Sequence, residues 1–208
     1  MMVVQPSKIV CVGRNYAAHA RELGNEIPTH PMLFYKPSSA LIGTGEAIVL
    51  PPVSNQVEYE AEIGVVIGTR ARRVSAAHAM ACVRGFTCAN DVTCRDLQKP
   101  DGQWGRAKGF DTFCPVGPVV AEGLDWRALV VIARVNGVER QRASVSAMIF
   151  SIPVLIEYIS GIMTLEPGDL ILTGTPEGVG PLAPGDVVEV EIPGVGILSN
   201  PVRGEISR

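Results

Sequence analysis

The stretch that decides the fold of this chain is Val57-Glu58-Tyr59-Glu60-Ala61-Glu62-Ile63-Gly64-Val65-Val66-Ile67. It begins acidic and continues into an apolar run, which predicts one long strand that ends at Gly68. Residues two apart in a strand share a face, roughly 6–7 Å apart, so Glu58, Glu60 and Glu62 point the same way. An exposed polar face would explain these carboxylates, but the apolar continuation is typical of a buried strand. Acidic residues that enter a buried strand indicate a hard cation bound through oxygen, such as Mg²⁺, Mn²⁺ or Ca²⁺.

A third acidic residue follows a second predicted strand. Asp91 lies in Asn90-Asp91-Val92-Thr93-Cys94-Arg95-Asp96, directly after Gly85–Ala89, so it would sit at the end of that strand. A turn or a helix cap would also explain this aspartate, whereas a metal site would use it as a third oxygen ligand. Arg95, one helical turn further on, has the planar fork that binds a substrate carboxylate, or else it pairs with Asp96 or another surface acid.

Two further places carry groups suited to catalysis. His19 and Glu22 lie three residues apart on a predicted helix, and therefore on one face of it. A carboxylate beside an imidazole orients it and raises its basicity, which is the arrangement of a general base, although the same spacing arises by chance in many helices. Lys108 lies in the apolar, glycine-flanked run Trp104–Phe110, which favours a placed cation over a solvated one.

Composition excludes several classes of function. The 208 residues are 47% apolar and 19% charged, with a formal net charge of −3, which is typical of a globular protein. No stripe of Lys and Arg is present, so we do not expect binding to nucleic acid or to an anionic membrane. Apolar runs such as Ala128–Ala133 are far shorter than the roughly 20 residues of a membrane span. Because Met1–Lys8 lacks the pattern of a secretion signal, we expect a cytoplasmic protein.

The cysteines favour the same compartment. Their odd number and the lack of Cys-x-x-Cys spacing argue against a disulfide framework or a zinc site. We therefore expect reduced thiols at all five positions, which are Cys11, Cys82, Cys88, Cys94 and Cys114.

The 22 glycines and 16 prolines divide the chain into short strands joined by turns. The strongest signal is Val130–Val135, Asn136-Gly137 and Val138–Arg142, because Asn-Gly provides the two positive φ angles of a type I′ hairpin. Further strands are expected at Lys8–Val12, Leu33–Tyr35, Leu170–Thr173 and Val187–Ile192, and helices from the capping residue Asn15 to Leu23, from Ser75 to Gly85, and from Pro153 onward. We predict a mostly β chain with a few helices at its margin (α+β), forming a single domain over residues 1–208.

Taken together, several segments resemble the fumarylacetoacetate hydrolase family, especially its short acylpyruvate hydrolase branch. They keep the family's order and cover nearly the whole chain, and the set is specific although no segment is decisive alone. The segments are Gly13-Arg14-Asn15-Tyr16-Ala17-x-His19, Lys36-Pro37-Ser38, Tyr59-Glu60-Ala61-Glu62-Ile63-Gly64, Asn90-Asp91-Val92-Thr93-x-Arg95-Asp96-x-Gln98, Ala107-Lys108-x-Phe110, Met148-Ile149-Phe150-Ser151 and Leu172-Thr173-Gly174-Thr175-Pro176.

The resemblance implies a mixed, mostly β roll that usually forms a homodimer. It implies that His19 and Glu22 activate water, from a helix that orders over the substrate, and that Lys108 is a catalytic cation beside the metal. The ligands of Mg²⁺ or Mn²⁺ that it implies are Glu60, Glu62 and Asp91, which leaves Glu58 out. The residues that it places against the substrate are Arg14, Tyr16, Lys36, Arg95, Gln98 and Thr175.

The function that the resemblance implies is hydrolysis of a C–C bond in an acylpyruvate-like 1,3-diketo acid, of the kind found in aromatic catabolism. The metal would act as Lewis acid and stabilise the enolate that leaves. Related enolates arise in two alternatives, oxaloacetate decarboxylase and 2-hydroxyhepta-2,4-diene-1,7-dioate/5-carboxymethyl-2-hydroxymuconate isomerase. A non-catalytic alternative is a β-rich scaffold that binds small molecules, and the intact acidic triad argues against it.

Overall fold

Three β-sheets make up most of the structure, a computed structural model that describes residues 4–205. The first three residues of the Met1–Lys8 stretch therefore lie outside the described part of the chain. The seven-stranded sheet has the order β2 (Met32–Lys36), β1 (Ile9–Gly13), β12 (Leu170–Leu172), β6 (Ala61–Ile67), β7 (Val83–Asn90), β9 (Cys114–Ala121) and β3 (Leu41–Ile42). The five-stranded sheet has the order β11 (Val138–Ser144), β10 (Val130–Val135), β14 (Val187–Ile192), β15 (Gly196–Gly204) and β4 (Ile48–Leu50), and the small sheet β13 (Gly180–Pro181), β5 (Val57–Tyr59) and β8 (Thr93–Cys94).

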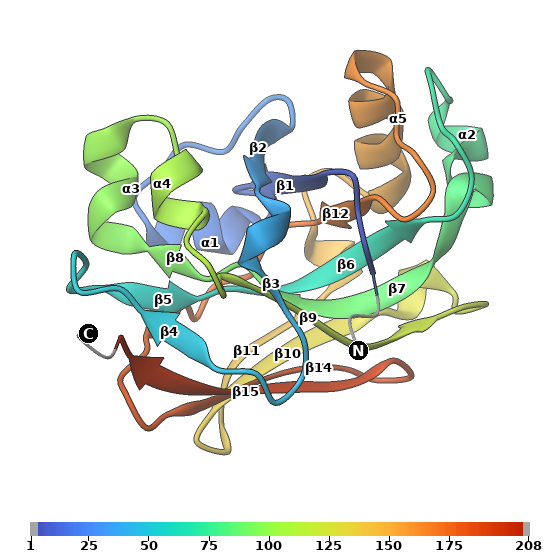
Figure 1. Cartoon of the computed structure of the whole chain (residues 1–208). Coiled ribbons are helices and arrows are strands. Elements are labelled where there is room, and N and C mark those ends of the chain that lie inside the picture. The colour runs from blue at the N-terminus through green and yellow to red at the C-terminus, as the bar shows by residue number, and fades with distance from the viewer. Residues whose placement is uncertain (1–3, 206–208) are drawn as a thin grey trace.

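The helices lie on the side of the molecule away from the five-stranded sheet (Figure 1). In the described part of the chain, the α-helices are α1 (Ala17–Glu22), α2 (Ala76–Ala79), α3 (Arg95–Asp101), α4 (Gly105–Lys108) and α5 (Ile152–Ile162). Short 3₁₀ turns span Ser38–Ala40, Met80–Cys82, Trp126–Ala128 and Val145–Ala147. Because β1 pairs with β12 in parallel while most other pairs are antiparallel, the sheet is mixed. The predicted class, mostly β with a few helices at the margin, is confirmed.

Strand β6 lies at the centre of the core, and all seven of its residues are buried. Ile63 and Val65 pack in the cluster that contains residues of β10 and β14, while Val66 packs on the opposite face with residues of β1 and β12. A strand covered on both faces reads as a continuous apolar run rather than an alternating one. This explains why the sequence turns uniformly apolar after Glu62.

The prediction of a single long strand from Val57 to Ile67 is wrong in one respect, because the strand is interrupted at Glu60. Strand β5 belongs to the small sheet and β6 to the large one. At the break, the backbone N–H of Glu60 donates to Asn90 Oδ1 at 2.9 Å, and the N–H of Ala61 donates to Gln141 Oε1 at 3.0 Å. Buried backbone groups need partners, and here two side-chain amides replace the missing strand neighbour.

The hairpin prediction is confirmed, whereas two helix predictions need correction. Asn136 and Gly137 have φ angles of 52° and 75° between β10 and β11. Asn15 does not cap α1, because its side chain joins Phe150 and Thr173 instead. The helix expected from Ser75 to Gly85 ends early, since β7 already begins at Val83.

All five cysteines are free and buried. Among the residues that the structure describes, no helix has the length and apolarity needed to cross a membrane.

The first prediction concerns Asp169, a buried carboxylate that ties the N-terminal segment to a turn. It accepts hydrogen bonds from the Ser7 amide (3.0 Å) and hydroxyl (2.7 Å), the Lys8 amide (3.1 Å) and the Glu166 amide (2.7 Å). The Lys8 ammonium also forms an ion pair with Asp169. Burial raises the pKa of Asp169, but the Lys8 ammonium, the Glu166 amide and the Ser7 hydroxyl outweigh burial and lower the pKa overall. Asp169→Asn removes the negative charge and places an amide nitrogen against the donors of one carboxylate oxygen, so we expect it to lower the unfolding free energy by roughly 2–3 kcal/mol at pH 7.

Urea denaturation at pH 7 and at pH 3.5 would measure this effect. A lowered pKa stabilises the folded state above the ordinary carboxyl pKa of about 4, and that stability is lost as the pH falls through the folded-state value. The difference between wild type and Asp169→Asn should therefore shrink at the lower pH. Asp111→Asn, at an exposed aspartate, should change stability by less than about 0.5 kcal/mol. Equal losses in both variants would contradict the role given to Asp169.

Candidate active site

A pocket of about 500 Å³ is lined by residues of α1, α3 and α4 and by residues at the adjacent ends of β6 and β7. Figure 1 shows these three helices gathered on one side of the molecule. Of the residues predicted from the sequence, the pocket is lined by Arg14, His19, Glu60, Glu62, Asp91, Arg95, Gln98, Lys108 and Thr175. They come from segments far apart in the chain, and the fold brings them together.

The acidic residues form one buried cluster. Glu60, Glu62 and Asp91 each offer an oxygen, and these atoms all lie within 4.8 Å of one another. Glu60 lies at the break before β6, Glu62 lies in β6, and Asp91 directly follows β7. Because β6 pairs with β7 in antiparallel register, with Ala61 opposite Asn90, the two acidic segments are adjacent. The Asp91 amide also donates to the Glu60 carbonyl at 2.8 Å, which holds the two residues side by side at the same end of β6 and β7.

Three cations neutralise part of this cluster. Lys108 Nζ lies 2.6 Å from both Glu60 Oε2 and Asp91 Oδ2, and Lys36 Nζ lies 2.7 Å from Asp91 Oδ1. Arg95 Nη2 donates to Glu60 Oε1 at 2.5 Å. Burial raises the pKa of Glu60, but Lys108 and Arg95 outweigh burial, so that the pKa of this carboxyl lies well below its usual range. Glu60 is therefore ionised at neutral pH.

Glu62 is in a different electrostatic environment. Burial, and then the negative charges of Asp91 and Glu60, raise the pKa of Glu62 well above its usual value. Its Oε2 accepts a hydrogen bond from the Gly174 amide at 2.6 Å. A divalent cation among the three carboxylates would favour ionised Glu62, and three anionic oxygens are the donors that Mg²⁺ and Mn²⁺ prefer. The residues therefore fit a hard divalent metal.

Glu58 lies outside the metal cluster. Its carboxylate accepts hydrogen bonds from Arg95 Nε at 2.7 Å and from Gln56 Nε2 at 2.6 Å. Spacing along the strand left three glutamates as candidates. The structure separates Glu58 from the others by the guanidinium of Arg95, which lies between Glu58 and Glu60.

His19 and Glu22 form a pair at the pocket wall. His19 is buried in α1, and its Nδ1 lies 3.1 Å from Glu22 Oε2. A carboxylate accepts hydrogen bonds and cannot donate one when ionised, so the hydrogen lies on Nδ1 and leaves Nε2 as the basic nitrogen. The other oxygen of Glu22 accepts a hydrogen bond from the Gly178 amide at 2.9 Å. Glu22 itself does not line the pocket. It contacts His19 through Nδ1.

Four other polar residues of the pocket, Arg14, Arg95, Gln98 and Thr175, also have partners in the structure. Arg95 Nη1 donates to Gln98 Oε1 at 2.6 Å, which joins both side chains on α3. Thr175 Oγ1 donates to the Ala61 carbonyl at 2.9 Å. Arg14 has a φ of 57°, a backbone conformation that residues other than glycine adopt at a cost in free energy. Its guanidinium lies 5.9 Å from the ring centroid of Trp104.

Two residues expected to contact the substrate, Lys36 and Tyr16, are not among the residues that line the pocket. Lys36 Nζ is buried among the carbonyls of Val92, Lys108 and Phe113, at 3.0, 2.5 and 2.8 Å. It therefore supports Asp91 from behind. Tyr16 is 1% exposed, and burial, followed by the charges of Glu62 and Glu177, raises the pKa of its hydroxyl.

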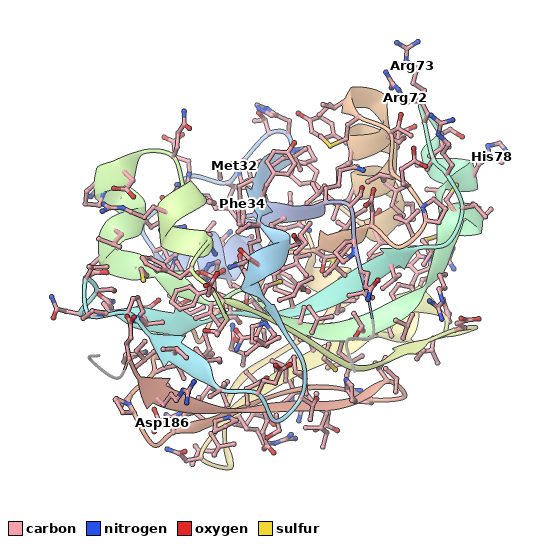
Figure 2. The ribbon with its side chains drawn as sticks, in the orientation of Figure 1. Met32, Phe34, Arg72, Arg73, His78 and Asp186 are labelled. Atoms are coloured by element: carbon pink, nitrogen blue, oxygen red, sulfur yellow. The ribbon has the colours of Figure 1, made fainter. Side chains whose placement is uncertain are left out.

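An apolar wall of the pocket was missed at the level of sequence. The rings of Phe34 and Trp104 meet edge to face, with centroids 5.1 Å apart, and Lys108 Nζ lies 5.0 Å from the Phe34 centroid. Figure 2 shows Phe34 and Met32 on β2, beside α3 and α4. The available signal was the alternation along β2, since Phe34 shares a face with Lys36. A Cβ on Gly13 would approach Trp104 to 2.7 Å, which explains the glycine there.

The second prediction concerns metal binding. Glu62→Ala removes one of three anionic ligands, so Mg²⁺ or Mn²⁺ affinity should fall by more than about 100-fold, beyond the 10- to 100-fold typical of outer-sphere changes. Glu58→Ala is the matched control on the same segment, because Glu58 reaches the cluster only through Arg95. Its affinity should change by less than about 10-fold. Isothermal titration of both variants tests this, and loss of the metal in Glu58→Ala with retention in Glu60→Ala would show that the ligand assignment is wrong.

Comparison with known proteins agrees with this site. The family model described as fumarylacetoacetate (FAA) hydrolase C-terminal matches residues 8–203. A mitochondrial oxaloacetate decarboxylase of Dictyostelium discoideum is 46% identical, over 90% of this chain and 89% of the relative.

Two crystal structures extend the comparison. The 5-carboxymethyl-2-hydroxymuconate delta-isomerase of Mycobacterium smegmatis is 46% identical, with a TM-score of 0.92 over 98% of this chain and 81% of that one. The fumarylpyruvate hydrolase of Pseudomonas aeruginosa, in complex with Mn²⁺ and pyruvate, is 33% identical, with a TM-score of 0.91 over 97% and 91%. The buried carboxylates Glu60, Glu62 and Asp91 are thus an acidic metal site on a fold that such enzymes share. With its family model matched over nearly its whole length, the chain belongs to the fumarylacetoacetate hydrolase family.

Proposed function

We propose that the chain hydrolyses a C–C bond in an acylpyruvate-like 1,3-diketo acid, with Mg²⁺ or Mn²⁺ as cofactor. The observation that carries this proposal is the position of His19, which lines the same pocket as the metal carboxylates and has its Nδ1 held by Glu22. An imidazole oriented in this way is a general base for water. The fumarylpyruvate hydrolase that was solved with Mn²⁺ and pyruvate supports a keto-acid ligand here.

The residues of the chain have separate roles in this reaction. A cation held by Glu60, Glu62 and Asp91 would supply Lewis-acid polarisation of keto-acid oxygens. His19 takes a proton from water, whose oxygen attacks the distal carbonyl carbon, while Glu22 keeps the imidazole in the required tautomer. The bond from that carbon to the methylene group breaks, and its electron pair goes to the pyruvate fragment. Protonation of the methylene carbon then gives pyruvate and a carboxylic acid.

Lys108 and the residues of α3 would stabilise charge and orient the substrate. Lys108 Nζ is buried against two of the metal carboxylates, where a positive charge acts strongly on negative charge that develops nearby. Burial lowers the pKa of Lys108, but Asp91 and Glu60 raise it above its usual value overall, so the ammonium stays charged. Arg14, Arg95, Gln98 and Thr175 also line the pocket and would bind a substrate carboxylate or carbonyl.

A second candidate is decarboxylation of oxaloacetate, or isomerisation of a muconate-type dioic acid. The relatives that bear these names favour it, because they are more similar to this chain than the fumarylpyruvate hydrolase is. Decarboxylation needs no activated water, since the carboxylate leaves as CO₂ and the electron pair passes to the keto-acid fragment. Hydrolysis and decarboxylation therefore differ in their dependence on His19.

The third prediction is that His19→Ala keeps metal binding and loses hydrolysis. General-base catalysis contributes about 10²–10⁴-fold, so kcat for acylpyruvate hydrolysis should fall by that factor while the Mg²⁺ affinity stays within about 3-fold of wild type. His78→Ala is the matched control, because this histidine lies on α2, outside the pocket. An unchanged hydrolytic rate in His19→Ala would remove His19 from the mechanism.

The fourth prediction separates the two candidate chemistries. His19→Ala should lower kcat/KM for acylpyruvate much more than kcat/KM for any oxaloacetate decarboxylation, whereas Asp91→Ala should lower both alike. The measurement is the ratio of the two kcat/KM values in wild type and both variants, with Mg²⁺ present. If wild type turned over neither substrate but isomerised a muconate-type dioate, the isomerase would replace the hydrolase as the function.

A further inference from the structure

One loop, Gly174–Gly180, contacts both the acidic metal cluster and the His19–Glu22 pair. At its start the Gly174 amide donates to Glu62 Oε2 at 2.6 Å. Four residues later the Gly178 amide donates to Glu22 Oε1 at 2.9 Å. The loop therefore joins a metal carboxylate to the carboxylate that orients His19, and its conformation sets how the two groups lie relative to each other.

The conformation at Gly178 is constrained on two sides. Its φ is +94°, and a Cβ there would lie 2.1 Å from the carbonyl oxygen of Arg140, so the backbone passes β11 at a distance that only glycine allows. On the other side, the hydroxyl of Tyr59 donates to the Gly178 carbonyl at 2.9 Å. Tyr59 lies in β5, and the next residue is the metal ligand Glu60.

Glu22 has little else to hold it. It ends the six-residue helix α1, and its side chain is 33% exposed. In the described part of the chain its carboxylate is hydrogen-bonded to His19 and to the Gly178 amide. An exposed side chain on a short helix samples several rotamers unless it is tied down. The Gly178 amide is the group that selects the rotamer facing His19.

We infer that Tyr59 is a positioning residue of this site, whose hydroxyl fixes Gly178 so that its amide orients Glu22 and, through Glu22, His19. The inference rests on the proposed function, in which His19 is the general base. Tyr59 touches no reacting atom in this scheme. It acts through the chain of contacts Tyr59–Gly178–Glu22–His19. Because Tyr59 is bonded to Glu60, these contacts also fix the position of His19 relative to the metal carboxylates.

Tyr59→Phe removes the hydroxyl and keeps the ring, so the fold should persist. We expect kcat for acylpyruvate hydrolysis to fall by about 5- to 20-fold, the effect of one lost hydrogen bond, with KM and Mg²⁺ affinity unchanged. Tyr35→Phe, which removes a hydroxyl from the half-exposed tyrosine of β2, should leave all three values unchanged. If Tyr59→Phe lowered the metal affinity by the same factor as kcat, or lowered the melting temperature while kcat of the folded protein stayed unchanged, Tyr59 would be merely structural and the inference would be wrong.

A double-mutant cycle with Glu22→Ala tests the route of the effect. If Tyr59 acts through Glu22, then adding Tyr59→Phe to Glu22→Ala should change kcat by less than about 2-fold, because the group on which it acts is already gone. Additive losses would mean that Tyr59 affects catalysis by another route, and the inference would be wrong.

The imidazole ¹⁵N spectrum provides a readout that needs no substrate. The chain has 3 histidines, so the His19 signals are assigned by their loss in His19→Ala. Wild type should show the Nδ1–H tautomer of His19, and Tyr59→Phe should shift a measurable fraction to Nε2–H. If this shift occurs while wild type hydrolyses no acylpyruvate, the proposed function fails and the positioning role stands. If wild type hydrolyses acylpyruvate and Tyr59→Phe alters neither kcat nor the tautomer, the positioning role fails alone.

Discussion

The mutual repulsion of three buried carboxylates is the constraint on which the rest of this site depends. Charges of one sign within 4.8 Å cannot stay ionised in a protein interior without compensation. Lys108, Lys36 and Arg95 neutralise Glu60 and Asp91, whereas burial and the negative charges of Asp91 and Glu60 leave Glu62 with a raised pKa. The protein therefore supplies enough positive charge to keep the cluster assembled, but not enough to satisfy its third member, which is the condition for binding a divalent cation.

The backbone around the cluster is interrupted at the first of its glutamates. Strand β5 ends at Tyr59 and β6 begins at Ala61, so Glu60 lies in the break and Glu62 lies in β6. The break leaves the amides of Glu60 and Ala61 without strand partners, and Asn90 and Gln141 accept hydrogen bonds from them. Gln141 also donates to Thr175 Oγ1 and to the Pro176 carbonyl. One buried amide side chain thus joins the strand break to the loop that carries Gly174, so the metal side and the base side of the pocket share a support.

The sequence allowed prediction of those features that depend on local pattern. The Asn136-Gly137 hairpin and the buried run of β6 depend on turn chemistry and apolar sequence, and both are found. The strand break at Glu60, the place of Asn15 between Phe150 and Thr173, and the position of Lys36 behind Asp91 depend on partners 30 to 158 residues away, which no local pattern encodes. Phe34 was missed because an aromatic residue in a short strand is usually a core residue, and Trp104, which directly precedes α4, was interpreted only as part of the apolar run around Lys108. The resemblance to a family, rather than spacing, was needed to leave Glu58 out of the ligand set.

The relatives are named as hydrolases, decarboxylases and isomerases. The division of this site into two parts explains how one family can include all three. The carboxylates and Lys108 hold charge, a need common to every reaction that leaves an electron pair on a keto-acid fragment. In the mechanism that we propose, the other part directs that electron pair and activates water, and it consists of His19 on a six-residue helix with Glu22 at its end. Because α1 is short and rests on the Gly174–Gly180 loop, changes there would alter proton transfer without disturbing the metal cluster. One fold can then carry several chemistries, and under the proposed mechanism the contact between α1 and that loop is where the choice between them would be made in this chain.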